Sequence, residues 1–268
     1  MLIKEYRIPL PLTIEEFRKA QLYATCEGSR QNTGGGEGIE VVLQEDFTSS
    51  TVCPGRTLTG TYTKKIYYLR SKVPWVLQKM LPPEAFELEE ESWNAYPYTK
   101  TVLTNPKYMK ENYKMIVESI HLPDNGSSNN PLNAPKKREI VYVDICDDKV
   151  IGKEGYKEEQ DPKVFTSEKN DRLPLTADWM DDQDPIMCAY KLVSVHFKWT
   201  GFSNIVEKTI QRQYPKIFAL FHRLAITLID NWYEMSLDEL REYEEETAEI
   251  LRKQINENEK RGTGFNEK

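Results

Sequence analysis

The chain has 268 residues, of which 39% are hydrophobic and 29% are charged. This composition is typical of a soluble folded protein and excludes a disordered or fibrous one. No stretch approaches the ~18 consecutive apolar residues that a membrane span requires. The N-terminus also lacks the basic and then apolar layout of a secretory signal, so we expect a cytoplasmic protein.

The net charge of −7 argues against a nucleic-acid-binding protein, because phosphate backbones require a basic surface. Residues 234–268 contain 11 acidic and 6 basic residues, a net charge of −5, which leaves −2 for residues 1–233. The body of the protein is therefore nearly neutral, and an anion must be bound by a local site. The four cysteines form no CxxC pair, so neither a disulfide framework nor a metal site is indicated.

The first two thirds of the chain alternate between one helix and several strands. Thr13 and Glu16 have the spacing of a capping box, and Ile14, Phe17 and Ala24 follow at helical spacing, which predicts a helix after Thr13. Runs rich in β-branched and aromatic residues, bounded by turn residues, then predict strands. They are residues 39–44, 60–70, 93–105, 113–121, 138–146 and 187–199. This pattern predicts an α+β fold with a mostly antiparallel sheet.

Two polar segments, residues 121–138 and 147–185, are predicted to be long loops, and the second has the length of a regulatory loop. Apolar residues at spacings of three and four from Val206 to Trp232 predict an amphipathic helix of about eight turns. A second capping box begins at Ser236 and predicts an acidic helix to about residue 256. We expect one domain over residues 1–268, in which residues 236–268 form a lid helix and a tail.

The sequence contains no recognisable catalytic or metal-binding motif. His121, His196 and His222 have no metal-ligand spacing, and we interpret them as structural. The run TGGGEG at residues 33–38 lacks the spacing of a phosphate-binding loop and leads into a strand, so we interpret it as a turn. We predict that the protein is not an enzyme and has no catalytic residue and no metal ligand.

Three polar residues interrupt apolar patterns. Lys191 lies in the apolar face of the strand at 187–199, Gln21 lies in the apolar stripe of the first helix, and Ser119 shares a strand face with Met115 and Val117. A buried lysine is costly unless it is paired. Each interruption alone is compatible with snorkelling or an edge position, but the three together suggest polar groups that converge on an anion inside an apolar cavity.

Aromatic residues stand at the corner between the last strand and the long helix. Trp199, Thr200 and Phe202 lie there, and we predict that they form a loop that contacts a membrane. Ordinary core packing of the aromatic side chains is an equally open interpretation.

Several segments, taken in their order along the chain, resemble a known family. They include TGGGEGIEV (33–41), SWNAYPYTKTVLTN (92–105) and CAYKLVSVHFKW (188–199), and together they are similar to the phosphatidylinositol transfer proteins from residue 4 to about residue 249. The resemblance implies a START-like helix-grip fold, in which a curved, mostly antiparallel sheet and long C-terminal helices enclose one phospholipid. It also implies a lipid carrier that exchanges phosphatidylinositol, and phosphatidylcholine as well, between membranes, with no cofactor besides the bound lipid.

The resemblance also assigns lipid-binding roles to residues of this chain. By similarity, the lipid phosphate is bound by Gln21, Thr101, Ser119 and Lys191. The inositol ring is bound by Thr63, Lys65, Asn94 and Glu245. Lysine and hydroxyl groups suit a phosphodiester, while carboxylate and amide groups suit ring hydroxyls.

Further expectations concern partners and regulation. The resemblance implies a monomer in the cytoplasm that associates transiently with membrane surfaces as a peripheral protein in phosphoinositide signalling, with lipid kinases as candidate partners. Ser167 lies in the long loop that carries a phosphorylation site in some relatives. The alternative function is a lipid-sensing adaptor that presents phosphatidylinositol, or binds phosphatidic acid, without bulk transfer. A START-like hydrolase or cyclase is disfavoured because no nucleophile and base pair is found.

Overall fold

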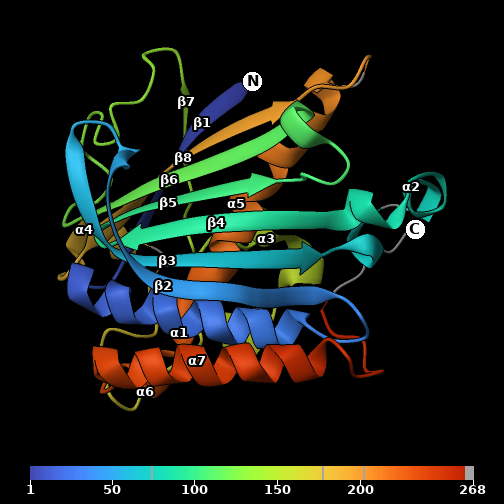
Figure 1. Ribbon diagram of the computed structural model, residues 1–268. Coiled ribbons are helices and arrows are strands. Elements are labelled where there is room, and N and C mark those ends of the chain that lie inside the picture. The colour runs from blue at the N-terminus through green and yellow to red at the C-terminus, as the bar shows by residue number, and fades with distance from the viewer. Residues whose placement is uncertain (74, 177, 202, 263–268) are drawn as a thin grey trace.

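One large curved sheet dominates the computed structural model, which describes residues 1–73, 75–176, 178–201 and 203–262 (Figure 1). Its eight strands lie in the order β2-β3-β4-β5-β6-β8-β1-β7. Every neighbouring pair is antiparallel except β1 and β7, which are parallel. The strands are β1 (Leu2–Leu10), β2 (Gly38–Cys53), β3 (Arg56–Tyr68), β4 (Glu87–Ala95), β5 (Tyr98–Thr104), β6 (Tyr113–Leu122), β7 (Glu139–Tyr142) and β8 (Met187–Phe197).

Helices cover one face and one edge of the sheet. They are α1 (Ile14–Asn32), α2 (Trp75–Met80), α3 (Asp148–Gly155), α4 (Trp179–Asp182), α5 (Ser203–Thr227), α6 (Ile229–Trp232) and α7 (Leu237–Gln254). Short 3-10 helices are η1 (Arg70–Lys72), η2 (Pro83–Phe86), η3 (Lys110–Asn112) and η4 (Glu158–Gln160). Figure 1 shows α1 and α7 side by side along the β2 edge, with α5 behind the middle of the sheet. The α+β class and the mostly antiparallel sheet predicted from sequence are confirmed.

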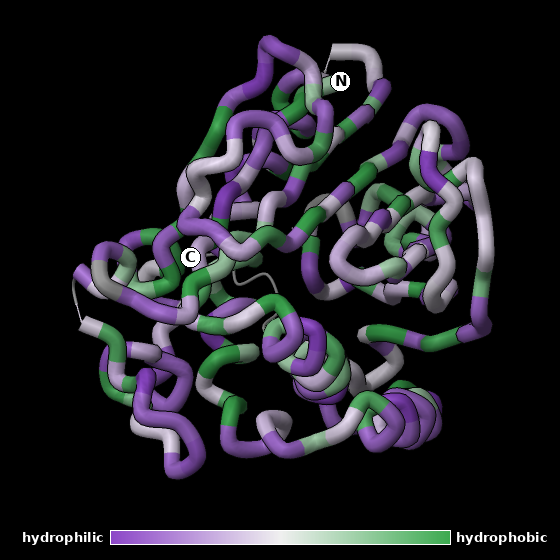
Figure 2. The backbone as a smooth tube through the Cα atoms, turned by 90° about the vertical axis from the view of Figure 1, so that its left-hand side faces the viewer, coloured by the Kyte–Doolittle hydropathy of each residue, from purple (hydrophilic) through white to green (hydrophobic). Residues whose placement is uncertain are grey.

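Both predicted capping boxes are present. The side chain of Thr13 accepts a hydrogen bond from the backbone of Glu16 at the start of α1, and Ser236 does the same with Glu239 at the start of α7. In the end-on view of Figure 2, the helices mix hydrophilic and hydrophobic residues, as expected for helices with one buried face. No helix in the described part of the chain is long and apolar enough to cross a membrane.

Strand β1 was not predicted, although it lies between β8 and β7 inside the sheet. Its residues are buried on both faces, and the charged Glu5 and Arg7 form an ion pair of 2.8 Å there. Arg7 also donates to the carbonyl of Gly126, at 2.6 Å. The predicted loop at 121–138 thus covers this face. Glu5 and Arg7 alternate with Tyr6 and Ile8 as on a half-exposed strand, but their face is buried by the loop and not exposed to solvent.

Three other predicted boundaries were wrong. Residues 93–105 form a hairpin of β4 and β5 that turns at the Tyr96–Pro97 peptide bond, and are not one strand. The long C-terminal helix ends at Thr227 and resumes as α6, where the indole of Trp232 donates to the carbonyl of Ala225, at 2.7 Å. In a continuous α-helix, the carbonyl of Ala225 would accept a hydrogen bond from the backbone amide of Ile229. The segment 147–185 contains α3, η4 and α4 and is not a continuous loop.

The main core lies between β1, β8 and α5. Tyr6, Ile8 and Leu10 on β1 are fully buried, and the ring of Tyr6 packs edge-on against Phe218 of α5 with centroids 5.3 Å apart. The hydroxyl of Tyr6 donates to the side chain of Gln211 at 2.8 Å. Helix α5 is thereby fixed across the inner face of the sheet, and the site described below lies on that face.

Candidate functional site

A row of polar residues crosses the inner face of the sheet. Strand register places Thr61 opposite Asn94, Asn94 opposite Thr99, Thr99 opposite Ser119, and Ser119 opposite Lys191. Directly paired residues in antiparallel strands project to the same face. These five residues, here called the polar row, include three residues that the sequence analysis singled out, from three different strands.

The next two rows lie on the same face, because side chains on a strand repeat every two residues. The second row consists of Thr63, Ser92, Thr101, Val117 and Val193. The third row consists of Lys65, Glu90, Leu103, Met115 and Val195. The face is thus polar at β3 and β4 and becomes apolar toward β6 and β8, apart from Ser119 and Lys191. All six predicted site residues on strands share this face.

Helices meet both ends of the polar row. At the β8 end, the ammonium of Lys191 lies 5.4 Å from the ring centroid of Phe218 on α5. At the β3 end, Arg241 of α7 donates to the hydroxyl of Thr61 at 2.6 Å. The row is therefore enclosed between the sheet and the C-terminal helices.

Lys191 has no carboxylate partner among the described residues. Burial lowers the pKa of its ammonium to about 8. Hydroxyl groups and aromatic rings surround it in place of a carboxylate. A buried ammonium without a counter-ion is unfavourable, so this position fits an anion that is supplied by a ligand.

Two other predicted residues carry buried polar atoms without a partner. The amide nitrogen Nε2 of Gln21 on α1 and the amide oxygen Oδ1 of Asn94 on β4 have no hydrogen-bond partner within residues 1–73, 75–176, 178–201 and 203–262. Buried polar atoms are bonded in the great majority of cases, so each unpaired atom calls for an explanation. An unpaired amide donor on α1 and an unpaired acceptor in the polar row fit a phosphate and a polyhydroxylated ring, respectively.

The third row carries a charged pair. The ammonium of Lys65 lies 3.9 Å from one carboxylate oxygen of Glu90, and the hydroxyl of Tyr67 donates to the other at 2.8 Å. Glu244 of α7 approaches the same region: burial raises the pKa of its carboxyl, and the charges of Arg241 and Lys65 oppose that shift. Its carboxylate lies 2.8 Å from Arg241.

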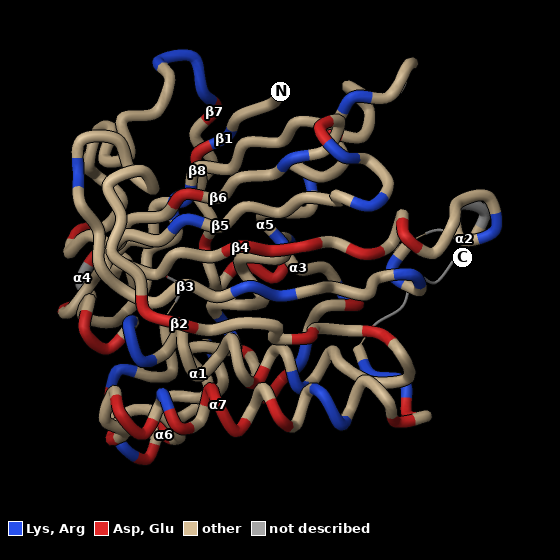
Figure 3. The backbone as a smooth tube through the Cα atoms, in the orientation of Figure 1, with Lys and Arg blue, Asp and Glu red and all other residues tan. Residues whose placement is uncertain are grey.

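Glu245, which is predicted to bind the inositol ring, lies on the exposed side of α7. The Glu245 side chain is exposed, whereas Glu244 is half-buried and faces the sheet. The phase of α7 is set by its buried residues Leu240, Thr247 and Leu251. Figure 3 shows acidic positions in succession along α7, so the acidic run itself does not indicate which carboxylate turns inward. Glu244 is thus the carboxylate of this run that lies near Lys65.

A small enclosed cavity of about 100 Å³ adjoins the β3 end of the polar row. Gly60, Asn94, Arg18 and Arg241 are among the residues that line it. The guanidinium of Arg18 lies over the ring of Tyr96, 5.7 Å from its centroid. This volume has room for a few water molecules beside the unpaired oxygen of Asn94.

The predicted membrane-contact residues lie at an exposed corner. Trp199 retains 37% of its surface, and Thr200 is exposed. The Trp199 ring also stacks on Phe197 with centroids 6.3 Å apart, so it is partly packed as well as partly exposed. Phe202 lies outside the described residues. Membrane contact by this corner stays a prediction.

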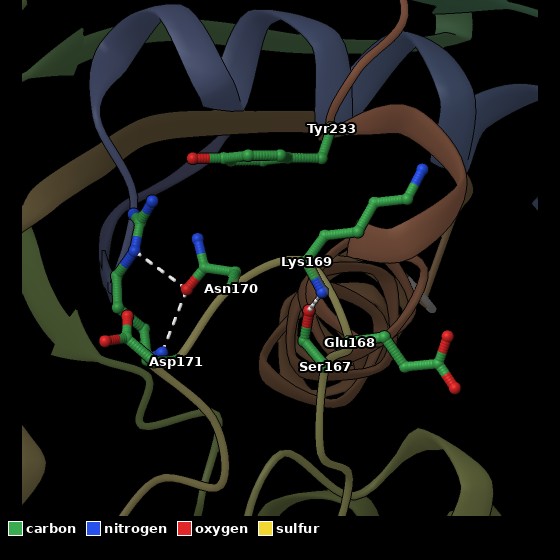
Figure 4. A pocket seen from close by; sticks show the side chains of 7 residues that line it. Ser167, Glu168, Lys169, Asn170, Asp171 and Tyr233 are labelled. Atoms are coloured by element: carbon green, nitrogen blue, oxygen red, sulfur yellow. Dashed lines mark hydrogen bonds between the residues drawn. The ribbon is translucent and has the colours of Figure 1, made fainter.

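Ser167 lies far from the polar row, beside α6. Its hydroxyl donates to the carboxylate of Asp230, whose second oxygen accepts from the backbone of Glu168 at 3.0 Å. Figure 4 shows the adjoining open hollow of about 420 Å³, lined by residues 167–172 and Tyr233. These contacts attach the loop to α6, and phosphorylation of Ser167 stays a prediction.

Sequence reasoning missed two hydroxyl residues of the polar row, Thr61 and Thr99. Each lies two residues before a predicted site residue on its own strand, and this period-two spacing was the signal that could have revealed them. No group of three or more metal-ligating side chains occurs among the residues that the structure describes.

Comparison with known proteins agrees with this geometry. A family model described as "Phosphatidylinositol transfer protein" matches residues 1–249. The chain is 39% identical over 272 residues to the phosphatidylinositol transfer protein beta isoforms of Bos taurus and Homo sapiens, covering 98% of each chain. It is 40% identical over 264 residues to phosphatidylinositol transfer protein 2 of Dictyostelium discoideum, covering 96% of this chain and 98% of the relative. The chain belongs to the phosphatidylinositol transfer protein family.

Proposed function

We propose that this protein is a carrier that encloses one phospholipid and exchanges phosphatidylinositol, and phosphatidylcholine as well, between membranes without changing a covalent bond. The observation that carries the proposal is Lys191 in the polar row, a half-buried lysine next to an otherwise apolar face, with no carboxylate partner among the described residues. The desolvation cost of a lone cation is offset when a bound ligand supplies the opposite charge.

The lipid phosphate is bound at the β8 end of the polar row. Lys191 provides the positive charge, Ser119 is its direct register partner, and Thr101 lies one row away on the same face. Gln21 adds the unpaired amide nitrogen from α1. Phosphate oxygens accept hydrogen bonds from ammonium, hydroxyl and amide donors, so this set fits the phosphodiester that both lipids share.

The inositol ring is bound toward β3 and β4. Thr63, Lys65 and Asn94 supply donors and acceptors from the sheet, and Glu244 supplies a carboxylate from α7. Ring hydroxyls both donate and accept, so they match this mixed set. Phosphatidylcholine has no ring hydroxyls, and these residues therefore select between the two lipids.

The apolar part of the inner face suits acyl chains. Two acyl chains with about 30 methylene groups would cost on the order of 20 kcal/mol to expose to water, at about 0.8 kcal/mol each. A carrier must therefore enclose them in transit and open only at a membrane. We propose that α7 and the segment after it form the lid, and that the Trp199 corner contacts the membrane during opening.

Native mass spectrometry of the purified protein tests the proposal. We expect one phosphatidylinositol or phosphatidylcholine molecule per chain. A protein that carries no phospholipid contradicts the proposal, and one that carries phosphatidylinositol but fails to move it between vesicles supports the adaptor function instead.

The glycine run at 33–38 forms the predicted turn, and it docks the proposed lid. The amides of Gly35 and Gly36 donate to the carbonyls of Glu257 and Ile255, at 3.0 and 2.9 Å. A Cβ added at Gly34 would lie 2.3 Å from the carbonyl oxygen of Glu259. Only glycine permits this close approach of the C-terminal segment.

We expect Gly34→Ala to displace the segment after α7 and to speed lipid exchange about fivefold, since a shift of about 1 kcal/mol changes an equilibrium by that factor. Limited proteolysis near residue 257 and a vesicle-to-vesicle assay measure the two effects. Gly28→Ala is the control, because its added Cβ meets only an ordinary contact of 3.8 Å with Leu224. Equal exchange by both variants would show that this contact does not hold the lid.

The pKa of Lys191 predicts an alkaline limit to lipid binding. Phosphate binding favours the charged ammonium, so affinity is constant well below the pKa of about 8 in the lipid-free protein. Above that pH the lysine must take up a proton to bind, and affinity falls by up to about tenfold per pH unit. Lipid loading at pH 6.5 to 9.5 measures this decline. A flat profile through pH 9.5 would contradict it.

A further inference from the structure

Two buried histidines near the proposed phosphate site have no assigned role. His121 on β6 and His222 on α5 are both fully buried. Three of their four ring nitrogens, namely Nδ1 and Nε2 of His121 and Nε2 of His222, have no hydrogen-bond partner among the residues that the structure describes. A purely structural histidine in a core normally satisfies its nitrogens, so these imidazoles need a further explanation.

Both imidazoles lie around Lys191. His121 follows Ser119 by two residues on the same face of β6, and Ser119 is the register partner of Lys191. His222 follows Phe218 by one helical turn on α5, and the Phe218 ring lies 5.4 Å from the Lys191 ammonium. The ring of Phe17 on α1 contacts both imidazoles, edge-on with His121 and stacked on His222, with centroids 4.9 and 5.6 Å apart.

The hydrogen bonding of His222 determines which nitrogen carries its proton. Nδ1 lies 2.7 Å from the backbone carbonyl of Phe218, which can only accept, so Nδ1 donates. Burial and the charge of Lys191 lower the pKa of His222 to about 3, and the same two causes lower that of His121 well below its ordinary value. Both rings are therefore neutral, and each has one nitrogen that can accept a hydrogen bond.

A neutral acceptor has a specific advantage beside a phosphate-binding lysine. A carboxylate would orient the ammonium but would also neutralise its charge and compete with the lipid phosphate. An imidazole orients the ammonium without removing its positive charge. The ammonium has three donors, enough for two imidazoles and one phosphate oxygen.

In the structure neither imidazole is hydrogen-bonded to Lys191, although the charge of Lys191 acts on both rings. We propose that, when the lipid phosphate binds, His121 and His222 act as positioning residues that accept hydrogen bonds from the ammonium of Lys191 and direct its charge toward the phosphate. This inference rests on the proposed function and adds two residues to its phosphate site. Because the phosphate is common to phosphatidylinositol and phosphatidylcholine, the histidines contribute to the binding of both lipids.

The other groups that face Lys191 do not titrate in the range that tests this inference. Tyr6 on β1 is the register partner of Lys191, and burial raises the pKa of its phenol, so it is neutral below pH 9. Cys188 lies on the opposite face of β8, and burial raises the pKa of its thiol as well. Gln21 on α1 and Ser119 on β6 have no titratable group. The decline of lipid binding above pH 8 therefore reports Lys191.

The test replaces each imidazole by a ring of similar size that has no nitrogen. His121→Phe and His222→Phe retain the aromatic contacts with Phe17 but remove the acceptors. Loss of a hydrogen bond to a charged group is expected to lower the transfer of both lipids about tenfold at pH 7.5. It should also move the alkaline decline to lower pH, because the ammonium is less stabilised. His222→Gln restores an acceptor near the position of Nε2 and should recover part of the activity.

His196→Phe is the matched control. His196 lies on β8 but on the face opposite Lys191, so we expect unchanged transfer and an unchanged pH profile. The assay measures transfer from donor vesicles of phosphatidylcholine that contain about 10% phosphatidylinositol to acceptor vesicles. Nitrogen-15 NMR of the lipid-loaded wild-type protein gives a second readout, in which Nε2 of His222 should show the shift of a hydrogen-bonded acceptor.

The outcomes separate this inference from the proposed function. If the two phenylalanine variants transfer both lipids like the wild type and retain its alkaline decline, the histidines do not position Lys191, while the carrier function stands. If a variant fails to fold, the nitrogen-15 shift decides, and a free acceptor at Nε2 overturns the inference. If the wild-type protein carries no phospholipid, the proposed function fails first.

Discussion

Lys191→Met is expected to abolish the exchange of both phosphatidylinositol and phosphatidylcholine while leaving the protein folded. Among the described residues of the polar row, Lys191 alone carries a positive charge, and in the proposed phosphate site it is joined by the hydroxyls of Ser119 and Thr101. Charge-assisted hydrogen bonds to phosphate are about twice as strong as neutral ones. We expect a fall of at least about 100-fold in transfer of either lipid, equivalent to roughly 3 kcal/mol.

The same substitution should stabilise the lipid-free protein. Burial lowers the pKa of Lys191 from 10.5 to about 8, so below pH 8 the folded state holds an ammonium that the unfolded state solvates better. This costs roughly 3 kcal/mol at neutral pH. Methionine removes that cost, and its advantage should shrink as the pH rises from 8 toward 10.5. Urea denaturation of delipidated protein at pH 7 and pH 10 measures the difference.

Lys114→Met provides the control for both measurements. Lys114 lies on β6 and is exposed on the opposite face of the sheet, so we expect neither transfer nor stability to change appreciably. Retained exchange of both lipids by Lys191→Met would show that the phosphate is bound elsewhere. A lipid-free variant that is less stable than the wild type at pH 7 would show that the lysine is paired.

Much of the phosphate end of the site could be predicted from sequence because strands have a period of two. On such a strand, a lysine or serine within an apolar face is visible without a structure, as at Lys191 and Ser119. The same holds for Gln21 in the apolar stripe of α1. These residues are informative because burial of a polar group without a partner is costly.

The features of the fold and the site that were not predicted depend on contacts between segments that are distant in the sequence. Strand β1 was missed although Glu5 and Arg7 alternate with Tyr6 and Ile8. The ion pair and the loop after β6 that bury both charges join segments far apart in the chain and are not visible in the sequence. The alignment of Thr61 and Thr99 with Lys191 is a matter of register across five strands, which no single segment encodes. Which of Glu244 and Glu245 turns toward the sheet depends on the phase of α7, and the acidic run does not reveal that phase.

The different positions of Glu244 and Glu245 lead to a prediction with a large expected effect, in which Glu245 serves as the control for Glu244. We expect Glu244→Gln to lower phosphatidylinositol transfer about tenfold and to leave phosphatidylcholine transfer unchanged, because only the inositol ring offers hydroxyls to this carboxylate. Glu245→Gln makes the same chemical change on the exposed side of α7 and should alter neither activity. Lys65→Ala, on the facing strand, should show the same selectivity as Glu244→Gln.

Parallel transfer assays with phosphatidylinositol and phosphatidylcholine on the same protein preparations measure this selectivity, since an unfolded variant would lose both activities. Equal loss of both lipids in Glu244→Gln would place the carboxylate in the stability of the closed lid and not in ring recognition. Loss of phosphatidylinositol transfer in Glu245→Gln, with Glu244→Gln active, would mean that α7 turns by one residue when the lipid is bound. Selective loss in Glu244→Gln and Lys65→Ala alone would support an inositol site between β3 and α7.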